Sequence, residues 1–160
     1  MKHTVRRFVA ADTDAVAALW TEAFPEDPAR NEPHGMIARK LARDPDLFWV
    51  ACVPAADAGV GSAGGAADSA GTGGEAIGAL MAGYDGVRGW LCHLAVSSAH
   101  RRRGVASGLV EHAVDVLRDL GCIKVNLQVR ETNREVRAFY ESLGWSEDPA
   151  MSMGRLLDDR

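Results

Sequence analysis

The sequence predicts a mixed α/β (α+β) fold, in which strands and amphipathic helices share one core. The strongest indication is the stretch 90–120, where an apolar run at residues 91–96 precedes an arginine-rich turn and a helical pattern. A second is the alternation of apolar and polar residues at 123–129, which is typical of a strand. A third is the apolar stripe at helical spacing over residues 16–24.

The N-terminal part of the chain predicts one strand and two helices. Residues 5–9 are the strand candidate, and Asp12 is a suitable N-cap for the first helix. Pro25 ends that helix, because proline cannot continue it. A polar, proline-rich segment then leads to a second short helix at about residues 34–43.

The next part predicts a hairpin with a long insertion. Residues 47–53 and 76–84 are apolar strand candidates that would pair with each other. Residues 54–75 between them are almost entirely Ala, Gly, Ser, Thr and Asp, and cannot bury enough surface to offset their ordering entropy. We therefore expect a flexible insertion within a single domain that spans all 160 residues.

The turn before the central helix has the composition of an anion site. Arg101, Arg102 and Arg103 precede a helix start, where the first N–H groups lack internal partners and the helix dipole is positive. Gly104 and Ala106 lack bulk, so a phosphate or pyrophosphate can approach the backbone. The alternative is a solvated basic turn.

The C-terminal part predicts a strand, a helix and a closing pair of strands. Gly121 is placed for a left-handed cap of the central helix, and residues 123–129 follow as the fifth strand. A short helix is expected at 135–143. Residues 145–147 and 151–157 are candidates for a closing antiparallel pair.

Composition excludes several classes of function. The formal net charge of −4 does not favour nucleic acid as a partner. No apolar run approaches the ~20 residues of a membrane helix, and the N-terminus shows no signal-peptide pattern, so we expect a cytoplasmic protein without membrane contact. Cys52, Cys92 and Cys122 lie in or beside strand candidates and are interpreted as reduced core residues, without metal-ligand spacing.

Two motifs, in this order along the chain, resemble the GNAT superfamily of acyl-CoA-dependent N-acetyltransferases. Arg101-x-x-Gly104-x-Ala106 fits the R/Q-x-x-G-x-G/A motif of that family, and residues 133–145 (NREVRAFYESLGW) resemble its Asn…(F/Y)-Y-x-x-x-G-(F/W) segment. The segment 84–96 is most similar to small bacterial members of the YpeA type. The resemblance implies the GNAT fold, with a mixed, mostly antiparallel sheet of about 6–7 strands and flanking helices.

The resemblance further implies acetyl-CoA as the acyl donor and no metal. In the family, the arginine–glycine loop holds the pyrophosphate, and the pantetheine arm enters where two parallel strands splay apart beside a bulge in the earlier strand. The expected coenzyme contacts are Leu94, Ala95, Val96, Arg101, Arg102, Arg103, Gly104, Val105, Ala106 and Asn133. Asn133 is equally suited to cap the following helix, and both roles can hold at once.

Two catalytic residues follow from the same resemblance. Tyr140 lies where GNAT enzymes commonly place the acid that protonates the coenzyme A sulfur; the alternative is a half-buried structural tyrosine. Many members carry a glutamate where this chain has His93, whose ordinary pKa of ~6.5 suits a base that accepts a proton directly or through water. The alternative for His93 is a core histidine satisfied by backbone.

In the family, the first two helices and their connection wall the acceptor site, which makes Trp20, Phe24 and His34 candidates for substrate contact. Asp85 and Arg88, in the turn before the central strand, would bind an ammonium and a carboxylate group. For Trp20 and Phe24 the alternative is plain core, and for Asp85 and Arg88 it is a structural turn.

The sequence thus predicts an N-acetyltransferase, monomeric or homodimeric, that uses acetyl-CoA and a primary amine of a small molecule or protein. The amine would attack the thioester directly. The alternative is a non-catalytic acyl-CoA-binding sensor or interaction module.

Overall fold

A computed structural model describes residues 2–53 and 74–157 of the chain. The chain divides into two compact units, Met1–Gln128 and Val129–Arg160. The insertion expected at residues 54–75 lies outside the described residues, apart from its last two positions.

The first unit contains a five-stranded sheet in the order β1-β2-β3-β4-β5. Its strands are β1 (Thr4–Arg7), β2 (Phe48–Cys52), β3 (Ala76–Tyr84), β4 (Gly89–Val96) and β5 (Val125–Asn126). The strands β1 to β4 pair with one another in antiparallel fashion, and β5 pairs with β4 in parallel. The mixed, mostly antiparallel sheet is confirmed. The described residues supply five strands where about six or seven were expected.

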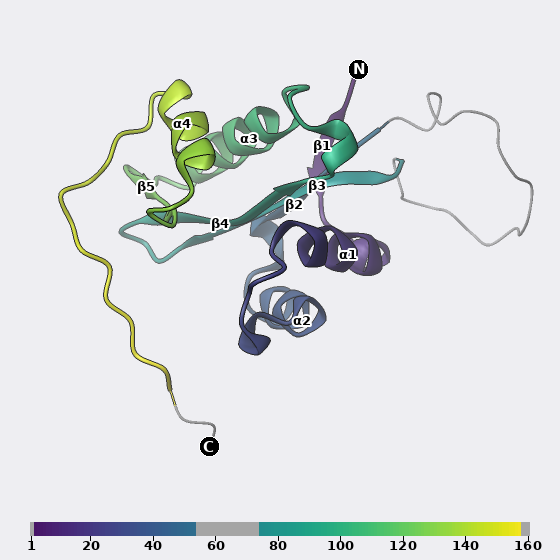
Figure 1. The fold of residues 1–160 in the computed structure, drawn as a ribbon, viewed down its shortest axis with the longest axis horizontal. Helices are drawn as coiled ribbons and strands as arrows, with labels where there is room; N and C mark the ends of the chain where they lie inside the picture. The colour runs from purple at the N-terminus through teal and green to yellow at the C-terminus, as the bar shows by residue number, and fades with distance from the viewer. Residues whose placement is uncertain (1, 54–73, 158–160) are drawn as a thin grey trace, which may run out of the picture. The chain divides into compact units, whose positions relative to one another are not determined.

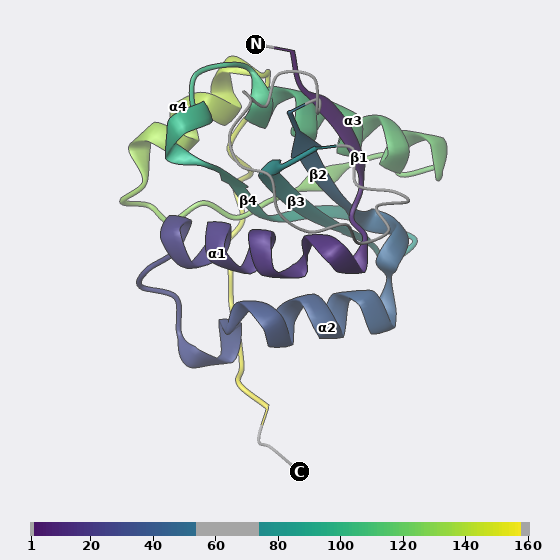
Figure 2. The ribbon, with the colours of Figure 1, turned by 90° about the vertical axis from the view of Figure 1, so that its right-hand side faces the viewer.

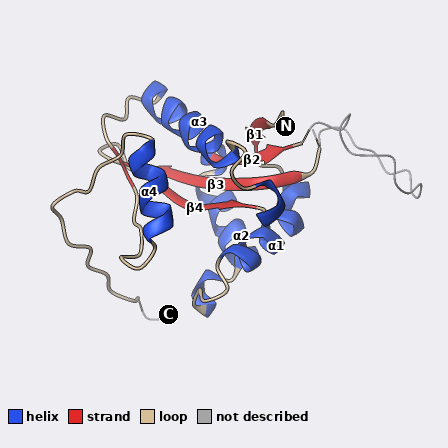
Figure 3. Ribbon diagram, turned by 45° about the horizontal axis from the view of Figure 1, so that its top comes forward, coloured by secondary structure: helices blue, strands red, loops and turns tan. Residues whose placement is uncertain are grey.

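Helices cover both faces of this sheet (Figures 1 and 2). The first unit contains α1 (Thr13–Ala23), α2 (Pro33–Arg43) and α3 (Val105–Asp119), with short 3-10 turns at Ala10–Asp12, Ala29–Asn31, Pro45–Leu47 and Ser98–His100. The strands lie between α3 on one side and the α1–α2 pair on the other (Figure 3). Every residue of β2 is therefore buried: Phe48 packs against Trp20 of α1, and Trp49 packs against His112 of α3.

Asp12 precedes α1, but its carboxylate does not cap that helix as the sequence predicted. The carboxylate accepts a hydrogen bond from the Val9 N–H at 2.9 Å and pairs with the Arg6 guanidinium at 2.7 and 2.8 Å. Asp12 is only 5% exposed, and a buried carboxylate needs such partners. The residue therefore ties β1 to the chain that enters α1.

The central strand β4 contains a β-bulge. Its register with β3 shifts by one residue between Ala79 and Met81, so His93 and Leu94 together oppose the single residue Leu80. His93 has φ 53°, which is uncommon outside glycine. The bulge expected in the earlier of the two parallel strands is confirmed.

The parallel strand β5 is shorter than the predicted 123–129. It pairs with β4 only through Gly89 with Val125 and Trp90 with Asn126, whereas β4 continues to Val96. The pairing therefore ends two residues after it begins, as expected for parallel strands that part.

The second unit contains α4 (Arg134–Ser142). The Asn133 side chain accepts a hydrogen bond from the Val136 N–H at 3.2 Å, so its capping role is confirmed. Tyr140 is 7% exposed, and its ring meets those of Phe139 and Trp145 at 5.0 and 5.5 Å.

The prediction of a closing antiparallel pair is wrong. Residues 145–147 and 151–157 form no strand in this unit, and every residue of 151–157 is exposed. None of the helices in residues 2–53 and 74–157 has the length and apolarity that a bilayer crossing requires.

Candidate functional site

The loop between β4 and α3 has the backbone of an anion cradle. Arg102 and Gly104 have left-handed φ values of 59° and 77°. Within α3, the Gly108 N–H donates to the Gly104 carbonyl at 2.9 Å, which is the first bond of the helical series. The N–H groups of residues 105–107 are therefore the orphan donors of the helix start.

Charge surrounds these donors. Arg101, Arg102 and Arg103 are all exposed, and the Arg101 Nε–H donates to the Val96 carbonyl at 3.3 Å, which ties the loop to the end of β4. A Cβ built on Gly104 meets nothing within 4 Å, so the positive φ, rather than crowding, favours glycine there. Open space, orphan donors and three cations fit the pyrophosphate that the sequence motif implies.

Within β4, His93 lies in the bulge, next to α1. The Trp20 Nε1–H donates to the His93 carbonyl at 3.1 Å. The Trp20 and Phe24 rings lie 5.3 and 5.5 Å from the imidazole, measured between ring centroids. The structure thus brings together three of the residues that the sequence singled out.

Asp27, which the sequence analysis missed, completes this cluster. Its Oδ2 lies 3.6 Å from the His93 Nε2 and accepts a hydrogen bond from the Asn31 Nδ2 at 3.1 Å. No local pattern marks Asp27, because its partner on β4 is far along the chain. The available signal was a carboxylate in the polar, proline-rich segment between the first two helices, which was expected to wall an acceptor site.

Burial controls the charge of His93. Desolvation lowers the pKa of His93 from its usual 6.5, and the nearby Asp27 carboxylate opposes that shift. His93 is therefore neutral at pH 7. Nδ1 is buried, and none of the described residues is its hydrogen-bond partner.

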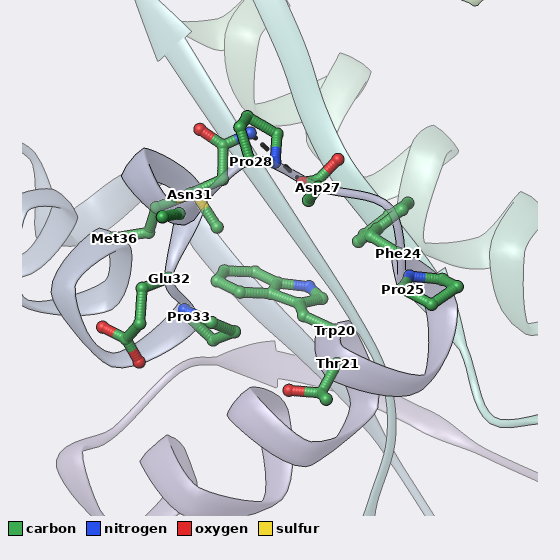
Figure 4. A pocket seen from close by; sticks show the side chains of 11 residues that line it. Trp20, Thr21, Phe24, Pro25, Asp27, Pro28, Asn31, Glu32, Pro33 and Met36 are labelled. Carbon is green, nitrogen blue, oxygen red and sulfur yellow. Dashed lines mark hydrogen bonds between the residues drawn. The ribbon is translucent and has the colours of Figure 1, made fainter.

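A pocket of about 240 Å³ opens between the end of α1 and the start of α2. Figure 4 shows the Trp20 indole at its centre, with Phe24 and Asp27 on one side and Met36 and Glu32 on the other. Two of the predicted substrate residues, Trp20 and Phe24, therefore line a cavity as well as packing in the core.

His34 does not line this pocket. It is an exposed residue of the first turn of α2, where its ring nitrogens lie 3.2 Å from Asp14 and 3.2 Å from Glu32. Hydrogen bonding to Asp14, and then to Glu32, raises the pKa of His34.

Asp85 and Arg88 close the hairpin between β3 and β4. The Asp85 carboxylate accepts hydrogen bonds from the Val87 and Arg88 N–H groups, both at 2.7 Å, and these bonds lower the pKa of Asp85. Neither Asp85 nor Arg88 lines the pocket beside Trp20. Their geometry is that of the structural turn, which was the alternative interpretation.

The remaining predicted contacts lie on β4 and in the second unit. Leu94 belongs to the bulge, and Ala95 and Val96 follow it with buried side chains. Asn133 and Tyr140 belong to α4 and its cap. Within the described ranges, no group of three or more His, Cys, Asp or Glu side chains is arranged to hold a metal ion.

Comparison with known proteins indicates the same family as the two sequence motifs. The sequence matches the model of the Acetyltransferase (GNAT) family over residues 13–145. A protein of Pectobacterium atrosepticum named acetyltransferase is 36% identical over 157 residues, which are 98% of this chain and 97% of the relative.

Two solved structures are similar in fold. Ard1 from Thermoplasma volcanium has a TM-score of 0.70 at 22% identity, over 90% of this chain and 82% of its own. AAC(6')-Iy, solved with a bisubstrate analogue of coenzyme A and acetylneamine, has a TM-score of 0.69 at 18% identity, over 99% of this chain and 100% of its own. The GNAT fold is therefore confirmed. Because the family match covers most of the sequence and includes both motifs, the chain belongs to the acetyltransferase (GNAT) family.

Proposed function

We propose that this protein transfers the acetyl group of acetyl-CoA to a primary amine by direct attack of the amine on the thioester. One observation carries the proposal: a single strand, β4, joins an anion cradle at its end to a pocket wall at its bulge. Holding two reactants in line across such a strand supplies much of the acceleration that an acyl transfer needs.

On the donor side, the N–H groups of residues 105–107 and the charges of Arg101, Arg102 and Arg103 would hold the pyrophosphate. The backbone of residues 94–96 would hydrogen-bond to the pantetheine arm as an added strand does, and Asn133 would add a contact. Bound acetyl-CoA supplies the activated thioester.

On the acceptor side, the amine would enter the pocket beside Trp20. An alkylamine has a pKa of ~10.4, so it arrives charged and must lose a proton before it attacks. His93 is neutral at pH 7 and so is able to accept that proton, directly or through water. The adjacent Asp27 carboxylate stabilises the imidazolium that results.

The departing sulfur also needs a proton, and we assign its delivery to Tyr140. A phenol with a pKa of ~10 and a thiol with a pKa of ~8.5 are matched closely enough for the transfer. The position of Tyr140 within the second motif supports the assignment.

Two assays test this function. Acetyl-CoA should raise the melting temperature, because a ligand of the folded state stabilises that state by mass action. A panel of primary amines should then release free coenzyme A thiol in proportion to acetylated amine. Stabilisation by acetyl-CoA without transfer to any amine would instead identify an acyl-CoA sensor. No stabilisation by any acyl-CoA would refute both functions.

A further inference from the structure

We propose that Asp27 binds the ammonium group of the acceptor and that the pocket selects amines carried on an uncharged, apolar body. This inference rests on the proposed function, since it names the substrate class of that reaction. It starts from the pocket between α1 and α2, whose lining includes a residue that no sequence motif marked.

The charge of the pocket is one-sided. The eleven described residues that line it include two carboxylates, Asp27 and Glu32, and no Lys, Arg or His. Its neighbour His93 is neutral at pH 7 and adds no positive charge. A cation entering this space therefore meets favourable charge, and a carboxylate or phosphate meets repulsion.

The carboxylates of Glu32 and Asp27 have different surroundings. Glu32 accepts hydrogen bonds from the His34 N–H at 2.9 Å and the Gly35 N–H at 2.7 Å, so it caps α2. Figure 4 shows its carboxylate turned away from the Trp20 indole. Asp27 is the carboxylate that lies on the same side as Phe24, next to the aromatic wall.

Asp27 is also held in place before a ligand arrives. The Asn31 Nδ2 donates to its Oδ2, and its own main-chain N–H donates to the Phe24 carbonyl at 3.1 Å. Its side chain is 17% exposed, so few waters screen its charge. A fixed, poorly hydrated carboxylate is well suited to bind an ammonium group, because little reorganisation is needed.

The rest of the lining indicates the body of the acceptor. Trp20 and Phe24 present aromatic surface, and Met36 and the prolines of the connecting loop add further apolar area. Aromatic rings also attract a nearby cation. At about 240 Å³ the pocket is smaller than the typical drug-sized site of about 300–1,000 Å³. It suits a small amine, or the aminated end of a larger molecule.

The charge requirement is tested by the binding of three probes that share a phenethyl group and differ in their terminal group. We suggest calorimetry on the full chain, in the presence of coenzyme A, with phenethylamine, phenethyl alcohol and 3-phenylpropionate. Wild-type protein should bind the amine at least about tenfold more tightly than the alcohol, and the acid most weakly. Equal affinity for amine and alcohol, or no measurable binding of the amine, would overturn the inference without any variant.

The substitution Asp27→Asn removes the charge and keeps the size of the side chain. It should weaken phenethylamine binding about tenfold and change phenethyl alcohol binding less than about twofold. Asp46→Asn is the matched control, because Asp46 is an exposed carboxylate that pairs with Arg7 outside the pocket. Equal amine affinity in Asp27→Asn and Asp46→Asn would refute the role of Asp27.

Different results would refute the proposed reaction and the proposed cation site. If the ammonium preference holds and no amine is acetylated, the reaction is wrong and the cation site stands. If amines are acetylated with the same KM by wild type and Asp27→Asn, the reaction stands and the cation site is wrong.

Discussion

The Trp20 indole N–H donates a hydrogen bond to the main-chain carbonyl of His93, with 3.1 Å between nitrogen and oxygen. This bond joins α1 to the bulge in β4. The positive φ of His93 takes the residue off the regular ladder, and a side chain of α1 provides a partner for its carbonyl.

Replacing Trp20 by Phe tests this bond. Trp20 is 1% exposed, so the change leaves a buried acceptor unpaired and a gap in the packing. We expect the free energy of unfolding, measured in urea, to fall by about 2–4 kcal/mol. Trp49→Phe is the control: it removes the same atoms from another buried tryptophan, whose ring packs against His112. Acetyl transfer should fall more in Trp20→Phe, and an equal fall in both would contradict the link to His93.

Gly104→Glu tests the anion cradle. The substitution places a negative side chain at the start of α3, and this charge would repel the negative pyrophosphate. It should therefore abolish the rise in melting temperature caused by acetyl-CoA. Gly121→Glu is the matched control at the other end of α3. Gly121 has φ 87° against 77° for Gly104, and a Cβ at either site meets nothing within 4 Å. Both variants should lose stability through backbone strain, and Gly121→Glu should still respond to acetyl-CoA. A normal response in Gly104→Glu would place the pyrophosphate elsewhere.

Tyr140→Phe tests the proposed acid. Removing the phenol oxygen should lower kcat by about 10²-fold or more while leaving the affinity for acetyl-CoA nearly unchanged. Thiol release and calorimetry measure the two quantities. Tyr84→Phe is the control, since Tyr84 is the other of the chain's two tyrosines and its hydroxyl donates to the Gly86 carbonyl in the hairpin turn. Loss of coenzyme affinity in Tyr140→Phe would assign this residue to binding instead of proton transfer.

Two histidines should affect stability in opposite directions with pH. The pKa of His93 is lowered from 6.5, mainly by burial, so the unfolded chain takes up this proton first. Its contribution to stability is complete above about pH 6.5 and is lost as the pH falls toward its folded pKa. The pKa of His34 is raised by Asp14 and Glu32, so its contribution is present below 6.5 and is lost as the pH rises through the folded pKa.

Urea unfolding between pH 5 and 7.5 separates these effects. His93→Gln should reduce the loss of stability on acidification, and His34→Gln should increase it, because each substitution removes one of the two opposing slopes. The same direction of change in both variants would contradict the assignment of charge states.

Signals close together in the sequence predicted the structure well. The start of α3 and the cap after it were visible because Gly104 and Gly121 lie within a few residues of the helix ends. The left-handed conformation predicted for Gly121 is confirmed, and Gly104 also has a positive φ. The helix α3, Val105–Asp119, lies where the stretch 90–120 predicted a helical pattern after the arginine-rich turn. The Asn133 cap was predicted for the same reason.

Features that depend on distant partners were not predictable in this way. Asp12 was expected to cap a helix, because nothing local shows that Arg6 of β1 binds its carboxylate. Asp27 went unnoticed because its partner, His93, comes from another element. The strand predicted at 123–129 has the right alternation, but only Val125 and Asn126 find a pairing partner on β4.

The extra residue in β4 has a consequence for engineering. His93 turns its carbonyl to α1 and its ring to the loop after α1, while the next residues run directly into the anion cradle. A substitution that removed the bulge would move His93, which lies beside the pocket proposed for the amine. It would also move the backbone of residues 94–96, which is proposed to hold the pantetheine arm. Attempts to change what the protein acetylates should therefore leave position 93 alone and vary the loop that carries Asp27.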